Sequence, residues 1–198
     1  MSNEKILFDD QITSLRSLSS IHQYLDENAV FMDASALLRS EYVLIVSAFD
    51  NYLHNLVRRK IRDNFFNSQF LPPNLSLPIT TYLSIHNETS TTIQQQLLDA
   101  SLRALLEKDS FQSPKSVEYA LGLINIKSIW SKVAPIMGDT AEHVRDRLAI
   151  IVQRRNQIAH EADIDPSTAT LRVINMQTVE DCRDFIQKLV GAVDSLAI

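Results

Sequence analysis

The segment from residue 35 to about residue 65 constrains the fold more than any other part of the chain. Its middle, EYVLIVSAFDNYLHNLV, carries apolar side chains around most of a helical circumference. A helix that is apolar on nearly every side must be surrounded by other elements. We therefore expect residues 35–65 to form a long helix at the centre of a helical bundle, opened by a cap at Asp33 or Ser35 and ended by the prolines of SQFLPPNLSLP.

The rest of the chain also favours helices over strands. Only three glycines occur in 198 residues, whereas an all-β fold needs many tight turns. Helical periodicity and capping signals predict further helices over residues 10–28, 91–109, 113–137 with a break near Gly122, 140–162 and 178–196. The stretch ATLRVI stands alone and is expected to be an extended connector. We expect one all-α domain over residues 1–198, a compact bundle of about six helices.

Composition and motifs exclude several classes of protein. The net charge of −5 gives no global basic field for nucleic acid, although it leaves a local basic site open. The single cysteine, Cys182, excludes a disulfide framework and a cysteine-built zinc site. No metal-ligand spacing and no glycine-rich phosphate loop occurs, so we expect no metal and no cofactor. The start of the chain does not resemble a signal peptide, and no apolar run approaches the ~20 residues of a membrane span. A soluble cytoplasmic protein is expected.

The segment VQRRNQIAHEAD, at the end of the helix predicted for residues 140–162, places a charge among apolar side chains. At ~100° per residue, Arg155 falls near the middle of an apolar line formed by Val144, Leu148, Ile151, Ile158, Ala159 and Ala162. A guanidinium there is partly desolvated and needs an acidic partner or an anionic ligand. Asp50 interrupts the apolar middle of the central helix, so an Asp50–Arg155 pair would explain both residues. A structural salt bridge and a functional site both remain open.

The run Arg155-Asn156-Gln157-Ile158-Ala159-His160 resembles the R-x4-H signature of HEPN domains, the higher eukaryotes and prokaryotes nucleotide-binding superfamily. SAFDNYLHNLV is similar to the corresponding segment of the RiboL-PSP type, and the resemblance extends from about Ser35 to Leu196. It implies a homodimeric, metal-independent endoribonuclease, of a kind that often acts as a toxin or antiphage effector beside an antitoxin or sensor. It also implies that Arg155 and His160 of both subunits are catalytic, that Asn156 supports them, and that Asp50 orients the arginine.

These residue types suit RNA cleavage without metal. The 2′-hydroxyl must lose a proton, the leaving 5′-oxygen must gain one, and the phosphorane charge needs stabilisation. Histidine titrates near neutral pH, and arginine matches phosphate oxygens in a forked geometry. One histidine cannot easily serve as both acid and base, but two chains supply two. The expected products carry 2′,3′-cyclic phosphate and 5′-hydroxyl ends.

Other interpretations of the same residues stay open. Arg58, Arg59, Arg147 and Arg154 could hold the RNA backbone, or they could form solvated helix faces. His160 could simply favour the dipole at a helix C-terminus. The chain could also be a non-catalytic HEPN module that binds RNA, nucleotide or a protein, or a helical dimer in which the arginine–aspartate pair only specifies the fold.

Overall fold

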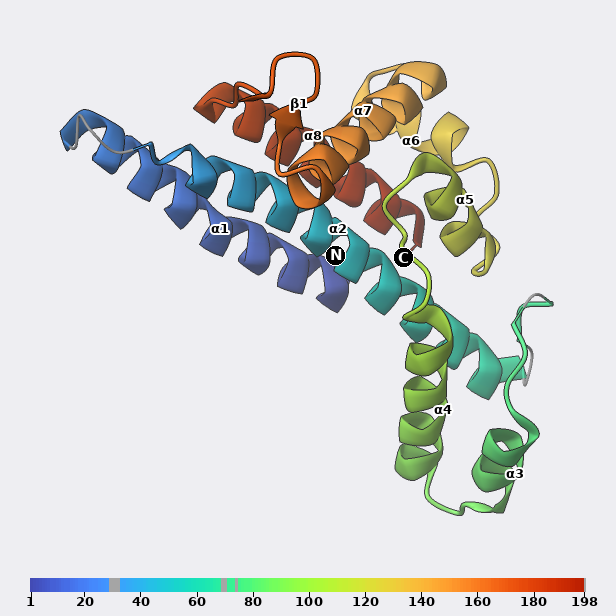
Figure 1. The fold of residues 1–198 in the computed structure, drawn as a ribbon. Coiled ribbons are helices and arrows are strands. Elements are labelled where there is room, and N and C mark those ends of the chain that lie inside the picture. The colour runs from blue at the N-terminus through green and yellow to red at the C-terminus, as the bar shows by residue number, and fades with distance from the viewer. Residues whose placement is uncertain (29–32, 69–70, 74, 198) are drawn as a thin grey trace.

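The computed structural model describes residues 1–28, 33–68, 71–73 and 75–197. Within them the chain forms eight helices and one two-stranded antiparallel sheet (Figure 1). In chain order the elements are α1 (Asn3–Asn28), α2 (Ser35–Ser68), α3 (Ile79–Asn87), α4 (Thr91–Leu106), α5 (Pro114–Gly122), α6 (Ile129–Met137), α7 (Ala141–His160), β1 (Ile164–Asp165), β2 (Thr170–Leu171) and α8 (Met176–Ala197). The predicted all-α class is confirmed.

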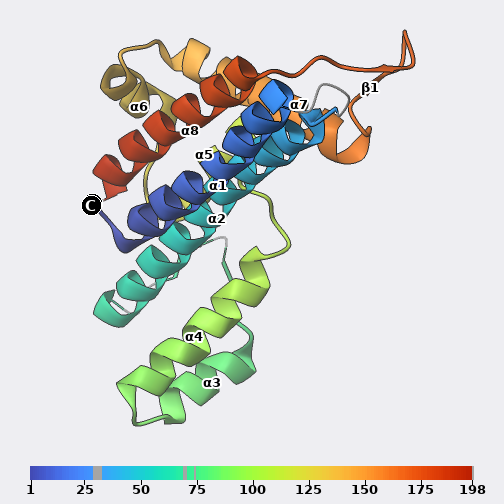
Figure 2. The ribbon, with the colours of Figure 1, turned by 90° about the vertical axis from the view of Figure 1, so that its left-hand side faces the viewer.

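Helix α2 lies at the centre of the bundle, as its sequence predicts. Helix α1 runs antiparallel along one side of it, and α7 and α8 pack against the other (Figures 1 and 2). The buried apolar side chains of α2 are Leu38, Tyr42, Ile45, Val46, Ala48, Phe49, Tyr52, Leu53, Leu56, Val57, Ile61 and Phe65. At ~100° per residue, those from Leu38 to Val57 cover about half of the helical circumference, so α2 packs against more than one neighbour.

Helices α3 and α4 form an arm beside the second half of α2. Both point away from the α7–α8 side of the molecule (Figures 1 and 2). Helix α4 was predicted, whereas α3 was not, so the estimate of about six helices was too low. The sequence of α3, ITTYLSIHN, is short and rich in β-branched residues, and such residues disfavour a helix in isolation. Packing against α4 stabilises it.

The predicted break near Gly122 separates α5 from α6. Ser113 caps α5 by accepting a hydrogen bond from the Ser116 backbone N–H, and Pro114 occupies the first turn. Ser128 then adopts the left-handed region, with φ 54°, immediately before α6. The backbone therefore turns sharply between the two short helices.

The segment after α7 differs from the expected connector. Residues of ATLRVI pair with the chain just before them, because Ile164 lies opposite Leu171 and Asp165 opposite Thr170. The prediction that this stretch stands alone was wrong: the partner strand is only two residues long, too short for its alternation to register in the sequence.

The two ends of the described chain meet beside α2. The backbone N–H of Ser2 donates to Asp194 Oδ2 on α8 at 3.1 Å (Figure 1). A second polar contact, fully buried, joins three helices: Arg183 of α8 pairs with Glu41 of α2, which also accepts a hydrogen bond from Ser19 of α1. In the part of the chain that the structure covers, every helix is too short or too polar to cross a membrane.

Candidate functional site

Arg155 lies on α7 one turn after the buried residue Ile151, in line with the helix face that packs on the core. Its Nε atom is buried and has no hydrogen-bond partner, and its Nη1 atom donates to Asn156 Oδ1 at 3.2 Å. Among the described residues no carboxylate lies within 4.0 Å of this guanidinium. The predicted partial desolvation of the Arg155 guanidinium is confirmed, and no carboxylate of the described residues compensates for it.

Asp50 is not the partner of Arg155. Its Oδ1 atom accepts a hydrogen bond from the Phe111 backbone N–H at 2.6 Å, and the nearest basic group is His54, at 3.8 Å. The predicted Asp50–Arg155 ion pair was therefore wrong within one chain. Asp50 holds the connector that links α4 to α5 instead, a contact between residues 61 positions apart, which a sequence pattern does not reveal.

His160 is the last residue of α7 and is exposed. After it the backbone reverses, because Ala162 and Asp163 both adopt positive φ, at 51° and 59°. The Asp163 backbone N–H donates to the Gln157 carbonyl at 3.0 Å, which closes the last turn of α7. The imidazole thus stands at the tip of a helix whose end has a fixed geometry.

The buried carboxylate of Asp163 fixes this helix end. It is completely buried and sits between two arginines, Arg39 of α2 and Arg154 of α7. Arg39 Nε lies 2.6 Å from Asp163 Oδ2, and Arg154 Nη2 lies 2.9 Å from the same oxygen. Arg39 also donates to the Arg172 carbonyl at 2.7 Å. These contacts tie the start of α2, the end of α7 and the strand segment together; sequence reasoning missed them, since Asp163 and Arg39 are 124 residues apart.

The arginines predicted to hold RNA mostly have partners within the chain. Arg154 is engaged by Asp163, and Arg147 lies 5.1 Å above the ring of Phe185. Arg59 Nε pairs with Glu4 at 2.7 Å. Arg58 is more loosely held, with Nη1 3.7 Å from an Asp99 oxygen. Neutralised cations contribute little to a positive potential, so the structure lends Arg59 and Arg154 no support as RNA ligands.

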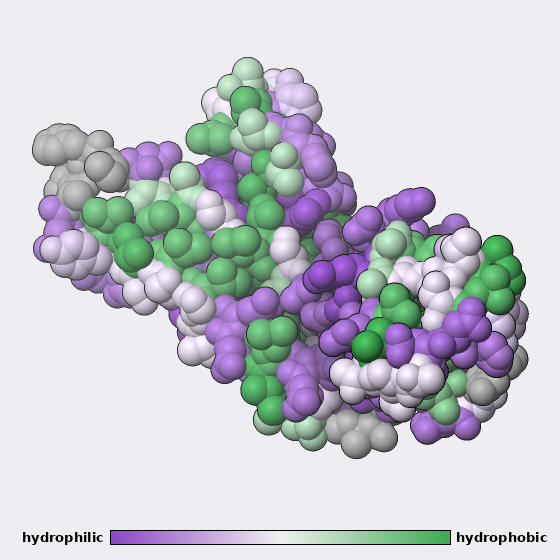
Figure 3. Space-filling model, turned by 90° about the horizontal axis from the view of Figure 1, so that it is seen from below, coloured by the Kyte–Doolittle hydropathy of each residue, from purple (hydrophilic) through white to green (hydrophobic). Residues whose placement is uncertain are grey.

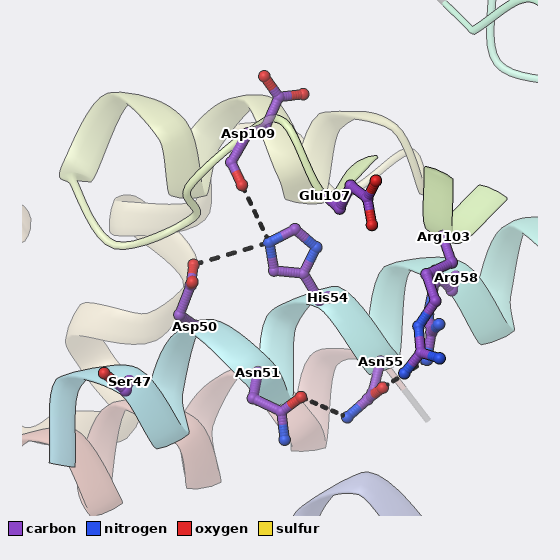
Figure 4. Close-up of a pocket in the computed structure, with 9 residues that line it drawn as sticks. All are labelled: Ser47, Asp50, Asn51, His54, Asn55, Arg58, Arg103, Glu107 and Asp109. Atoms are coloured by element: carbon purple, nitrogen blue, oxygen red, sulfur yellow. Dashed lines mark hydrogen bonds and ion pairs between the residues drawn. The ribbon is translucent and has the colours of Figure 1, made fainter. Parts of the chain in front are cut away.

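Two cavities contain the remaining predicted residues. One, of about 310 Å³, lies between α7 and the start of α5, and it includes Asn156. The other, of about 290 Å³, lies between α2 and the end of α4, and it includes Asp50 and Arg58 (Figure 4). The structure therefore divides the predicted supporting residues between two places. Over the described residues, no group of three or more histidine, cysteine, aspartate or glutamate side chains is arranged to hold a metal ion.

An all-α bundle around one long apolar helix is the fold expected for a HEPN domain. The model of the RiboL-PSP-HEPN family matches residues 9–198, so the chain belongs to this family. Searches of curated proteins and of solved structures found no match.

Proposed function

We propose that this protein is a metal-independent endoribonuclease whose active site forms between two copies of the chain. The observation that carries the proposal is the buried, unpartnered Nε of Arg155 five residues before an exposed histidine. A buried donor without an acceptor is unfavourable, by ~1–3 kcal/mol. Phosphate oxygens of a bound RNA strand would pair with the partly exposed guanidinium of Arg155, in the forked geometry that suits it.

The second copy supplies what one chain lacks. Cleavage through the 2′-hydroxyl needs a general base and a general acid, and His160 is the one histidine of the motif. Two His160 imidazoles, one from each chain, divide these roles, while the arginines stabilise the phosphorane. Asn156 supports Arg155 through their hydrogen bond. The products carry a 2′,3′-cyclic phosphate and a 5′-hydroxyl.

Apolar surface around the motif helix supports such a dimer. Ile150 on α7 is 65% exposed and Val173, after β2, is 87% exposed. Ile164 and Leu171, which face each other across the strand pair, are also exposed. Exposed apolar side chains favour an interface, and these four lie on α7 or in the strand segment that follows it.

The biological role that fits this activity is that of a cytoplasmic toxin or antiphage effector. An RNase that cut cellular RNA without control would stop growth, so an antitoxin or sensor protein is the expected further partner. Induced expression of the wild-type chain should arrest growth, whereas induced His160→Ala should not.

The direct test is RNA cleavage by purified protein in excess EDTA. Wild type should cut and leave 5′-hydroxyl ends, and both Arg155→Ala and His160→Ala should lower the rate at least ~100-fold, the usual contribution of a general acid or base. His143→Ala is the matched control, because this exposed histidine lies in the first turn of the same helix and its side chain pairs with Asp139. Full activity of His160→Ala would refute the proposal. Saturable RNA binding without turnover in wild type would instead assign the chain to the non-catalytic HEPN modules.

A further inference from the structure

Helices α1 and α2 each carry a second row of side chains that does not face the core. The rows follow the alternating three- and four-residue spacing of a coiled-coil seam. Their members are Leu7, Gln11, Ser14, Leu18, Ile21 and Leu25 on α1, and Leu37, Ser40, Leu44, Ser47 and Asn51 on α2. None of them is fully buried, and Ile21 and Leu44 are 47% and 43% exposed. Hydrophobic side chains accordingly gather over α1 and α2 when the molecule is seen from below (Figure 3).

A cavity of about 320 Å³ joins the two rows into one surface, which we call the α1–α2 face. Small side chains form part of its wall, namely Ser14 of α1 with Ser47 and Ala48 of α2. The exposed Leu44 lines the same cavity. The face therefore presents a leucine beside a hole between small residues. A two-fold contact between identical copies needs this combination, because each copy then inserts its leucine into the hole of the other.

The two ends of the α1–α2 face differ in charge. The end where α1 stops and α2 begins carries Asp26, Glu27 and Asp33, which form no ion pair within the described residues. The opposite end of α2 carries four basic residues, Arg58, Arg59, Lys60 and Arg62. Over the described chain only three carboxylates lie within 4.0 Å of these four. An antiparallel pair of copies places each acidic end against a basic end, whereas a parallel pair places like charges together.

The α1–α2 face is large enough for a stable contact. Helix α1 has 26 residues, so it is ~39 Å long, and two helices side by side are ~20 Å wide, a footprint of ~800 Å². A stable interface buries ~800 Å² on each partner. The arm of α3 and α4 projects beside one end of the face (Figures 1 and 2). A second copy turned by half a rotation fits beside this arm, because its own arm then lies at the opposite end.

We infer that the α1–α2 face binds the α1–α2 face of a second copy of this chain, antiparallel and around a two-fold axis. The four helices pack as a bundle in which Leu44 of each copy fills the hole of the other. This contact differs from the proposed active-site contact, which is formed by α7 and the strand segment after it, so the inference does not depend on RNA cleavage. Two different two-fold contacts on one chain produce an assembly of four or more copies.

The test is the number of chains per particle, measured by light scattering of the full chain at micromolar concentration. Wild type should contain four or more chains. Leu44→Asp and Ile21→Asp should each leave two chains, joined through α7, because a carboxylate buried against apolar side chains is unfavourable. Both variants should still cut RNA at the wild-type rate, since neither residue belongs to the proposed active site.

Ile136→Asp is the matched control. Ile136 is 52% exposed and lies on α6, away from α1 (Figure 1). This variant should keep the wild-type number of chains. All three substitutions are at exposed positions, so each variant should keep the far-UV circular dichroism of wild type.

Exchanging charges tests the antiparallel direction of the contact. Asp33→Lys and Arg62→Glu should each weaken the association of Ile150→Asp chains at low salt at least ~10-fold, because like charges then face each other. The variant with both substitutions should recover the association, since opposite charges again meet at both ends. A double variant that stays dissociated would overturn the antiparallel pairing.

A wild-type particle of only two chains would separate this contact from the active-site contact. If Leu44→Asp then gives single chains, the α1–α2 contact exists and the contact through α7 fails. If Leu44→Asp and Ile21→Asp both keep two chains, the inference is overturned. A single chain in wild type, or an unchanged larger assembly in both variants, would overturn it as well.

Discussion

At the scale of single residues, the neighbouring arginines Arg154 and Arg155 differ in whether their side chains have a partner. Arg154 is neutralised by a buried carboxylate, whereas Arg155 keeps a buried nitrogen without a partner. The ion pair of Arg154 contributes to stability, whereas the unpartnered nitrogen of Arg155 lowers it. Such an unsatisfied group persists where function requires it.

Replacing Arg155 with methionine should separate stability from activity. Arg155→Met keeps a long flexible side chain and removes the unpartnered buried donor, so the free energy of unfolding should stay equal or rise by ~1 kcal/mol. RNA cleavage should be lost. Urea unfolding at a fixed protein concentration and an RNA cleavage assay measure the two effects. A marked loss of stability would mean that the guanidinium is satisfied in the folded protein, contrary to our interpretation.

Asp163→Asn should have the opposite effect on stability. It leaves Arg39 and Arg154 without their shared negative charge, and breaking a buried ion pair in this way costs ~3–5 kcal/mol. Cleavage should fall as well, since the end of α7 that presents His160 loses its anchor. Asp146→Asn, at an exposed position of the same helix, should change the unfolding free energy by less than ~0.5 kcal/mol. Equal stability of the two variants in urea would rule out the anchoring role.

At the scale of elements, local sequence signals predicted most helices and missed the features that depend on neighbours. The apolar circumference of α2, Pro114 at the start of α5 and Gly122 before the break all act through the local backbone. Helix α3 and the strand pair after α7 depend on contacts with adjacent segments. The start of the last helix, predicted at residue 178, shows a smaller error: α8 begins at Met176, and Asn175 Oδ1 accepts from the Thr178 backbone N–H at 2.9 Å.

The cap of α7 offers a test at this scale. Thr140 Oγ1 accepts a hydrogen bond from the His143 backbone N–H at 3.2 Å. Thr140→Ala should lower the free energy of unfolding by ~1 kcal/mol, as for other N-cap residues. Thr140→Ser keeps the hydroxyl and should lose less. If both variants unfold at the same urea concentration as wild type, the cap does not stabilise α7.

At the scale of the whole molecule, polar contacts between distant segments decide the site, and the sequence does not reveal them. Asp50 was expected to meet Arg155, yet it holds the α4–α5 connector, and Asp163 takes its arginines from two helices. Glu41 and Arg183 form another buried pair, 142 residues apart. Asp50, Glu41 and Arg183 lie on helices, whereas Asp163 lies in the turn after α7. The sequence pattern identified only Asp50 among these four residues, and the tertiary fold chooses the partner of each.

The reaction rate of the Cys182 thiol measures whether this core is intact. It is buried in α8, and burial raises the pKa of its thiol to about 12. Because the thiolate is the reactive form, native protein at pH 8 should react with a thiol reagent far more slowly than unfolded protein. The rate should rise in parallel with urea unfolding. Rapid labelling of the native chain would show that α8 is not packed as described.

The central claim is that one active site needs His160 from two chains. Wild-type and His160→Ala subunits, co-refolded in equal amounts at constant total protein, should retain about a quarter of the RNA cleavage rate of wild type alone, because random pairing makes about a quarter of the dimers fully wild type. A residual rate of about half would mean that each chain cuts on its own, and would contradict the account.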